Sequence, residues 1–181
     1  MRVRLTVSPM FVLFVCAFCY LDGLGLFAPF FLAAALHECG HLLALRLLRA
    51  PVRELRLGLT GAVIRAELLS PRTELLCALA GPAVNLGLAL LFRKAAPAFY
   101  FCNALLFLYN MLPVPPLDGG RICRLILPGS VCLALQYAVI LSAVVFGVWG
   151  TCVRHWGLLP CAFAAFFLLR LPKSLVKRGE G

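Results

Sequence analysis

The sequence has little charge and very little acid. Only 13% of its 181 residues are Asp, Glu, Lys or Arg, compared with about 25% in ordinary soluble domains. Apolar residues make up 63%, compared with about 45–50%. A soluble globule of this length cannot bury so much apolar surface. The composition therefore excludes a soluble domain and a disordered chain, and it indicates an integral membrane protein.

The chain also lacks a disulfide framework, because its nine cysteines are scattered mostly inside apolar runs. Seven acidic residues against 17 basic ones give a net charge of +10. In a soluble protein this charge would suggest nucleic acid as a partner. In a membrane protein the position of each charge relative to the bilayer decides its meaning.

Six apolar runs are candidate spanning helices: residues 5–21, 24–48, 73–92, 97–112, 129–151 and 156–171. If the N-terminus is cytoplasmic, fourteen of the 17 basic residues fall on the cytoplasmic side and three outside. That asymmetry is typical of membrane proteins. It predicts about six transmembrane helices with both termini in the cytoplasm. It also explains the net charge without nucleic acid. The first run lacks a cleavage site, so we expect a retained anchor.

Residues 51–68 have a different pattern: Leu55, Leu57 and Leu59 alternate with Arg56, Gly58 and Thr60, and the short run Ala62-Val63-Ile64-Arg65-Ala66-Glu67 follows Gly61. This predicts two short strands, a small β-hairpin at the membrane edge. No internal repeat or separate soluble domain is evident. We therefore expect one membrane-embedded domain over residues 1–181. Its core would cover about 24–125, followed by C-terminal helices over 129–171 and a basic tail over 172–181.

The second apolar run contains His37-Glu38-Cys39-Gly40-His41, the pattern H-E-x-x-H. In a helix, residues four apart lie on the same face, so His37 and His41 can bind one metal ion. Glu38 then lies beside the metal as a candidate catalytic base. Polar packing inside a helix bundle is the alternative. Ionisable residues within a membrane are costly, however, and are functional by default.

A catalytic zinc ion usually has three protein ligands, so a third is needed. The other histidine and most acids lie outside the membrane or at its edge in the predicted topology: Asp22, Glu54, Glu67, Glu74, His155 and Glu180. Asp118 remains. It follows a segment with three prolines, which must end the fourth helix near Leu112. Non-helical backbone at membrane depth is tolerated where it is buried or lines a watery cavity, so this segment is a candidate site wall.

Asn85 and Asn110 are polar side chains at membrane depth, and each needs hydrogen-bond partners. Either could hold substrate backbone, orient a metal ligand or join two helices.

Together these motifs resemble the site-2 protease family, the intramembrane zinc metalloproteases. The resemblance is carried by 37–41, by Ala80-Gly81-Pro82-Ala83-Val84-Asn85 and by Asn110 through Gly120, which ends in Pro-Leu-Asp-Gly-Gly. It implies that His37, His41 and Asp118 bind zinc, that Glu38 is the catalytic base and that Asn85 and Asn110 help bind substrate. The compact six-span form resembles the subgroup that processes a sporulation sigma-factor precursor, although neither a PDZ nor a CBS domain is evident.

This resemblance implies cleavage of a transmembrane or membrane-associated protein near the cytoplasmic side, with the lipid bilayer as environment and a regulatory membrane protein as a further partner. A catalytically inactive scaffold or chaperone is the main alternative, although such proteins usually lack a ligand or the base. A zinc transporter would need polar residues along several spans. Two histidines and a carboxylate also suit iron, so zinc rests on the placement of Glu38 and on the resemblance.

Overall fold

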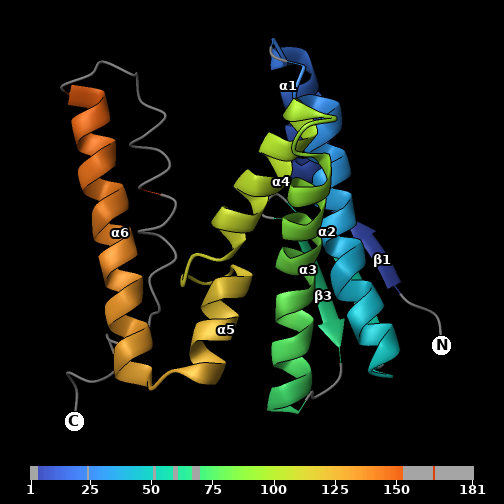
Figure 1. Ribbon diagram of the computed structural model, residues 1–181, viewed down its shortest axis with the longest axis vertical. Coiled ribbons are helices and arrows are strands. Elements are labelled where there is room, and N and C mark those ends of the chain that lie inside the picture. The colour runs from blue at the N-terminus through green and yellow to red at the C-terminus, as the bar shows by residue number, and fades with distance from the viewer. Residues whose placement is uncertain are drawn as a thin grey trace. The chain divides into compact units, whose positions relative to one another are not determined.

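The computed structural model describes residues 4–23, 25–50, 52–58, 61–66, 70–152 and 165. The chain divides into two compact units, Met1–Tyr109 and Asn110–Gly181, which are described separately. Helices predominate. The elements, labelled in Figure 1, are β1 (Arg4–Val7), α1 (Pro9–Leu21), α2 (Phe27–Leu47), β2 (Val52–Gly58), β3 (Gly61–Ala66), α3 (Pro71–Phe92), α4 (Pro97–Asn110), α5 (Asp118–Ile126) and α6 (Gly129–Cys152).

The centre of the first unit is the contact between α2 and α3, which lie side by side (Figure 1). The two helices are antiparallel, because His37 bonds to Asn85 and His41 bonds to Cys77 further back along α3. Gly40 brings the helix backbones together: a Cβ at this position would lie 2.9 Å from the Ala80 carbonyl oxygen. Small residues of this kind allow close helix packing where lipid supplies no hydrophobic drive.

Local capping fixes where these two helices begin. Ser70 is extended and accepts a hydrogen bond from the Thr73 N–H at 3.2 Å, with Pro71 in the first turn of α3. This is a standard N-terminal cap, and proline is favoured directly after it. The Asp22 carboxylate accepts hydrogen bonds from the N–H groups of Leu26 and Phe27, at 2.8 and 2.9 Å, where α2 begins. A negative charge is stabilising at this end of a helix.

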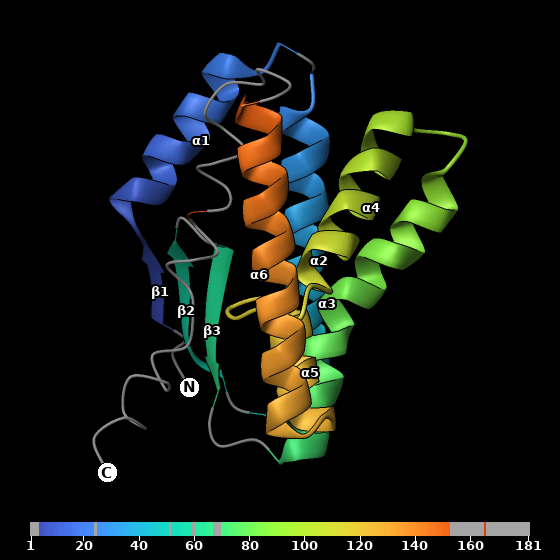
Figure 2. The same ribbon diagram turned by 90° about the vertical axis from the view of Figure 1, so that its left-hand side faces the viewer.

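A three-stranded sheet completes the first unit, with β2 between β1 and β3 (Figure 2). The strands β2 and β3 occupy the segment for which the sequence predicts a hairpin, and they pair antiparallel, with Leu55 opposite Ile64. The strand β1 pairs parallel with β2, so that Leu5 lies opposite Leu55. Residues 51, 59–60 and 67–68 of the predicted hairpin segment lie outside the described part of the chain.

The prediction of a spanning helix over residues 5–21 is wrong at its beginning. Residues Arg4–Val7 form β1, Ser8 is extended, and the helix begins at Pro9. The residue before a proline avoids the helical region, and proline itself is favoured in a first helical turn. The remaining helix has 13 residues, or about 20 Å, which is shorter than the roughly 30 Å of a bilayer core.

Among the described residues, three helices are long and apolar enough to cross a membrane: α2, α3 and α6, with 21, 22 and 24 residues. α4 has 14 residues and ends at Asn110, two residues before the end that the prolines predict. The expected sixth span, residues 156–171, lies outside the described residues apart from 165. The number of six spans therefore stays a prediction.

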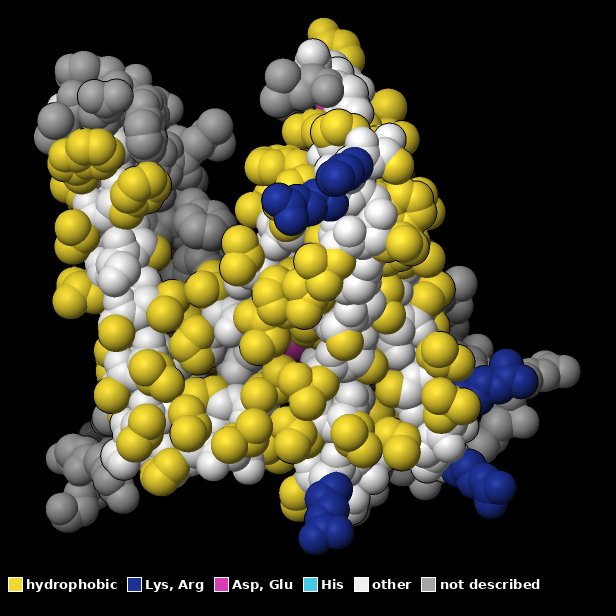
Figure 3. Space-filling view, in the orientation of Figure 1, with side chains coloured by type: hydrophobic (Ala, Val, Ile, Leu, Met, Phe, Trp, Pro, Cys, Tyr) yellow, Lys and Arg dark blue, Asp and Glu magenta, His cyan; other side chains and the backbone are white. Residues whose placement is uncertain are grey.

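The surface of the first unit has the character expected of a membrane-spanning protein. Figure 3 shows mostly apolar side chains over the middle of its helices and basic side chains near their ends. Exposed basic residues occur where α2 and α3 end or begin: Arg46, Arg49, Arg72, Arg93 and Lys94. Leu43, Leu47, Leu90 and Leu91 lie exposed along the same two helices. An apolar band between basic ends is typical of helices that cross a bilayer.

The second unit begins with a non-helical segment, 111–117, which leads into α5 and α6. This segment is folded on itself: Val114 N–H donates to the Leu112 carbonyl at 2.8 Å, and Leu117 N–H donates to the Val114 carbonyl at 3.0 Å. Val114 is fully buried. The helix α5 was not predicted from the sequence, because Gly119 and Gly120 in its first turn are poor helix formers.

Candidate metal centre

His37 and His41 lie one turn apart on α2, and both side chains are buried, with 5% and 8% of their surfaces exposed. Their rings meet edge to face with centroids 4.7 Å apart. The two Nε2 atoms lie 3.1 Å from each other. The H-E-x-x-H spacing predicts that both histidines share one face of the helix, and the geometry confirms this. Both rings lie on the same face of α2, and the Nε2 atom of each faces the other ring.

Each ring is held from behind by an acceptor on α3. The Nδ1 of His37 lies 2.5 Å from the Asn85 Oδ1, and the Nδ1 of His41 lies 2.7 Å from the Cys77 carbonyl oxygen. Since these oxygens can only accept, each Nδ1 carries the hydrogen and donates it. The lone pair of each neutral imidazole is then on Nε2, the nitrogen that faces the other ring.

This pair fits a metal ion better than it fits simple packing. Two nitrogen lone pairs 3.1 Å apart repel each other unless a proton or a metal ion lies between them. Two histidine nitrogens bound to tetrahedral zinc lie roughly 3.3 Å apart, since each is about 2.0–2.1 Å from the metal. Histidines that bind metals almost always donate their other N–H to a carbonyl or carboxylate, as both rings do here.

Gly81 makes room for the two rings. A Cβ at this position would collide with the His41 Nε2 and would lie 2.7 Å from the His37 Cε1. Such contacts essentially never occur, so any side chain here would displace a ring. Gly81, within the Ala-Gly-Pro motif, therefore has a defined physical role, which is to leave the space that the two imidazole rings occupy.

Asn85 is completely buried and connects α2, α3 and α4. Its Oδ1 accepts from His37, while its Nδ2 donates to the Ala33 carbonyl at 3.3 Å and to the Asn103 Oδ1 at 2.9 Å. The sequence left three roles open for Asn85, and in the structure its side chain orients His37, a candidate metal ligand. The substrate-binding role implied by the resemblance stays a prediction.

Glu38 follows His37 on α2 and is half-buried. One residue corresponds to about 100° of helix rotation, so the carboxylate lies beside the histidine face of α2 and not on it. This is the placement expected of a base that acts next to a metal without binding it.

Asp118 lies in the second unit, as the first residue of α5, and its side chain is buried. The two glycines after it allow the backbone of α5 to lie directly against the preceding segment. A Cβ on Gly119 would lie 2.6 Å from the Leu112 carbonyl oxygen, and one on Gly120 would lie 2.6 Å from the Val114 carbonyl carbon. Close backbone approach is therefore what these two glycines permit. Asn110, the last residue of α4, is half-buried, and its substrate role stays a prediction.

Asn103 was missed by the sequence analysis. It lies within α4 with none of its surface exposed. The available signal was only that a third asparagine occurs in an apolar run. The alternative ligands Glu67, His155 and Glu180 lie outside the described residues.

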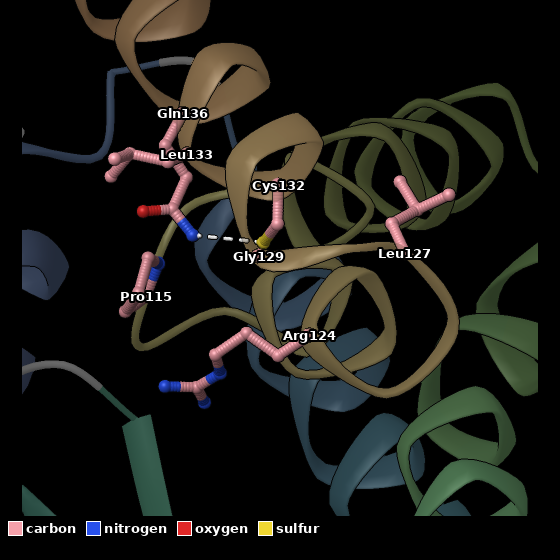
Figure 4. Close-up of a pocket in the computed structure, with 7 residues that line it drawn as sticks. All are labelled: Pro115, Arg124, Leu127, Gly129, Cys132, Leu133 and Gln136. Atoms are coloured by element: carbon pink, nitrogen blue, oxygen red, sulfur yellow. Dashed lines mark hydrogen bonds between the residues drawn. The ribbon is translucent and has the colours of Figure 1, made fainter.

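The second unit also contains a cavity of about 240 Å³ where α5 meets α6, shown in Figure 4. Pro115, Arg124 and Gln136 line it, and Gln136 donates through Nε2 to the Cys132 Sγ at 3.2 Å. Cys123 of α5 is buried. Burial first, and then its hydrogen bond with Cys132, raise the pKa of the Cys123 thiol to about 11. It is therefore protonated near neutral pH.

The buried histidine pair and the three membrane-length helices define the class of protein, a helical membrane protein built around a candidate metal centre. Comparisons with known proteins agree. A sequence model of Peptidase family M50 matches residues 92–148, a stretch that contains Asn103, Asn110 and Asp118. The H-E-x-x-H motif lies outside that stretch.

The chain is 34% identical over 106 residues to "Putative zinc metalloprotease Rip3" of two Mycobacterium tuberculosis strains, Erdman and H37Rv. The match covers 49% of this chain, and the chain spans about a quarter, 27%, of the length of these relatives. Among solved structures, a site-2 protease from Methanocaldococcus jannaschii has the same fold. The TM-score is 0.66 at 20% sequence identity, over 93% of this chain and 90% of that one. The resemblance to the site-2 protease family is thus confirmed.

The close contact between Gly81 and the two imidazole rings can be tested by substitution. In Gly81→Ala, the new methyl group displaces His37 or His41. We therefore expect the purified variant to retain less than about a tenth of the wild-type metal, because even loss of an outer-shell partner costs about 10–100-fold in metal affinity. Gly87→Ala is the matched control in the same helix, because a Cβ there meets nothing within 4 Å. Metal content by mass spectrometry checks this, and equal metal in the two variants would contradict it.

Proposed function

We propose that this chain is a zinc-dependent intramembrane metalloendopeptidase, which cleaves a transmembrane or membrane-associated protein substrate near the cytoplasmic side. The observation that carries the proposal is the pair of buried Nε2 atoms, 3.1 Å apart, with Glu38 next to them in the chain. A redox or transport role needs no carboxylate base beside the ligands, whereas metal-assisted hydrolysis does.

His37, His41 and Asp118 are the proposed zinc ligands. Support for Asp118 comes from its chemistry and its surroundings: a buried carboxylate remains ionised only with a cation or strong hydrogen-bond donors. The segment 111–117 and the two following glycines hold it in a defined backbone position. Zinc, when bound, supplies a Lewis acid that acidifies water and polarises the peptide carbonyl.

The protein side chains carry out the rest of the proposed reaction. A carboxylate oxygen of Glu38 takes a proton from the attacking water and then gives it to the leaving amine. Asn85 and the Cys77 carbonyl keep both imidazoles oriented through their Nδ1 hydrogens throughout. Asn110 helps to hold the substrate backbone, as the family resemblance implies.

The substrate must be extended at the cleaved bond, because a helix shields its peptide groups. In the described part of the chain, β1 and β3 each pair on one side only. An extended substrate could add to such an edge by main-chain hydrogen bonds. We therefore propose a substrate whose transmembrane helix unwinds easily. We also propose a regulatory membrane protein as a partner, and a location in a bacterial cytoplasmic membrane with both termini inside. A role in sporulation is the most specific form of the proposal.

The base assignment has a direct test. Glu38→Gln removes the proton acceptor but leaves both histidines, so we expect the wild-type metal content and loss of at least about 99% of the cleavage rate of a membrane-protein substrate. Cleavage products are measured by gel electrophoresis and metal by mass spectrometry in the same preparation. Cleavage at the wild-type rate by Glu38→Gln would show that another group is the base.

The third ligand is tested separately. Asp118→Asn removes the negative charge with little change in size, and we expect metal retention to fall by at least about tenfold. Glu67→Gln provides the comparison, because Glu67 is an acidic residue of the predicted hairpin segment that was set aside as a ligand. If Glu67→Gln loses metal and Asp118→Asn keeps it, the third ligand is Glu67.

A further inference from the structure

Asn103 belongs to none of the motifs, yet it is one end of an unbroken chain of hydrogen bonds that reaches the metal centre. Its Nδ2 donates to the Phe99 carbonyl at 2.8 Å, one turn back on α4. Its Oδ1 accepts from the Asn85 Nδ2 at 2.9 Å. The Asn85 Oδ1 in turn accepts from the His37 Nδ1. Asn103, Asn85 and His37 are 0%, 0% and 5% exposed, so water cannot readily take the place of any link.

The order of donors and acceptors in this series of hydrogen bonds is set by its first acceptor, the Phe99 carbonyl. A backbone carbonyl can only accept, so the Asn103 amide must turn its NH₂ group toward Phe99 and its oxygen toward Asn85. Asn85 must then present its own NH₂ group to Asn103 and its oxygen to His37. An oxygen facing the His37 Nδ1 requires the hydrogen on that nitrogen. The lone pair is consequently on Nε2, where a metal can bind.

A reversed Asn85 amide would break this order. It would set an NH₂ group against the Nδ1–H of His37, and two donors cannot share a hydrogen bond. His37 would then have to move its hydrogen to Nε2, and a protonated Nε2 cannot bind a metal. The Ala33 carbonyl also accepts from the Asn85 Nδ2, but at 3.3 Å it is the longer of the two contacts. Asn103 is therefore the stronger of the two groups that orient Asn85.

We propose that Asn103 is a positioning residue of the metal centre: through Asn85 it fixes the tautomer and ring orientation of His37. This inference rests on the proposed function, because it presumes that His37 binds a metal. The carbonyl behind His41 belongs to the backbone and cannot turn over. The His37 side needs a residue such as Asn103 because its acceptor is a side-chain amide with two possible orientations.

The test measures metal affinity in full-length, detergent-purified protein by competition with a chromophoric zinc chelator at pH 7. Asn103→Leu and Asn103→Ala remove both links, and we expect zinc affinity to fall by about tenfold, the lower end of the range for outer-shell partners. In Asn103→Asp, a carboxyl group buried in apolar surroundings stays protonated. Its hydroxyl can donate to Phe99 and its carbonyl can accept from Asn85, so we expect affinity within about threefold of wild type.

A matched control and a double mutant separate positioning from general loss of structure. Gln136→Leu also removes a buried amide, whose hydrogen bond to Cys132 lies within α6, and we expect unchanged zinc affinity. In an Asn85→Leu background, Asn103→Leu should have no further effect, because Asn103 acts only through Asn85. Cobalt substitution gives a second readout: the visible absorption band should be altered in Asn103→Leu and restored in Asn103→Asp.

The outcomes distinguish the two proposals. Wild-type affinity in both Asn103→Leu and Asn103→Ala, or an undiminished further loss in the Asn85→Leu background, would overturn the positioning role while leaving the proposed function intact. A folded wild-type protein that binds no divalent metal would overturn the proposed function, and the positioning role with it.

Discussion

The close contact between α2 and α3 is the constraint on which the rest of the structure depends. Gly40 allows the helix backbones to approach, and Gly81 leaves the space that both imidazole rings fill. Only at this separation can the Asn85 amide and the Cys77 carbonyl reach the two Nδ1 atoms. The metal-binding face of α2 is thus formed by α3, through small residues and two acceptors, and not by the H-E-x-x-H spacing alone.

The apolar surroundings strengthen these hydrogen bonds and also require that every buried polar group has a partner. A polar group buried without a partner costs several kcal/mol in hydrocarbon, roughly 2–7 kcal/mol. Asn85 meets this requirement with three partners, two on α2 and one on α4, and Asn103 meets it with two. The same bonds that satisfy these amides also orient His37. One set of hydrogen bonds therefore does two things in this structure: it offsets the cost of burying polar groups, and it orients a metal ligand.

Much of the site could be predicted from the sequence because its chemistry is local. The spacing of His37 and His41 places them on one helical face, and the prolines before Asp118 predict where α4 ends. The Cys77 acceptor could not be predicted, since it is a backbone carbonyl that any residue would provide. Asn103 could not be assigned either, because nothing in its spacing indicates that it faces α3. The first apolar run was misjudged at its beginning because Arg4–Val7, with only four residues, is too short for its pattern to separate a strand from the start of a helix.

The central claim is that the two Nε2 atoms bind a catalytic metal ion, and the metal content of detergent-purified protein tests it most directly. We predict about one zinc per chain in the wild type and almost none in His41→Ala, because two ligands cannot replace the three of a catalytic site. No metal in folded wild-type protein, even after zinc is supplied, would contradict the account and favour a scaffold that has the fold without the activity.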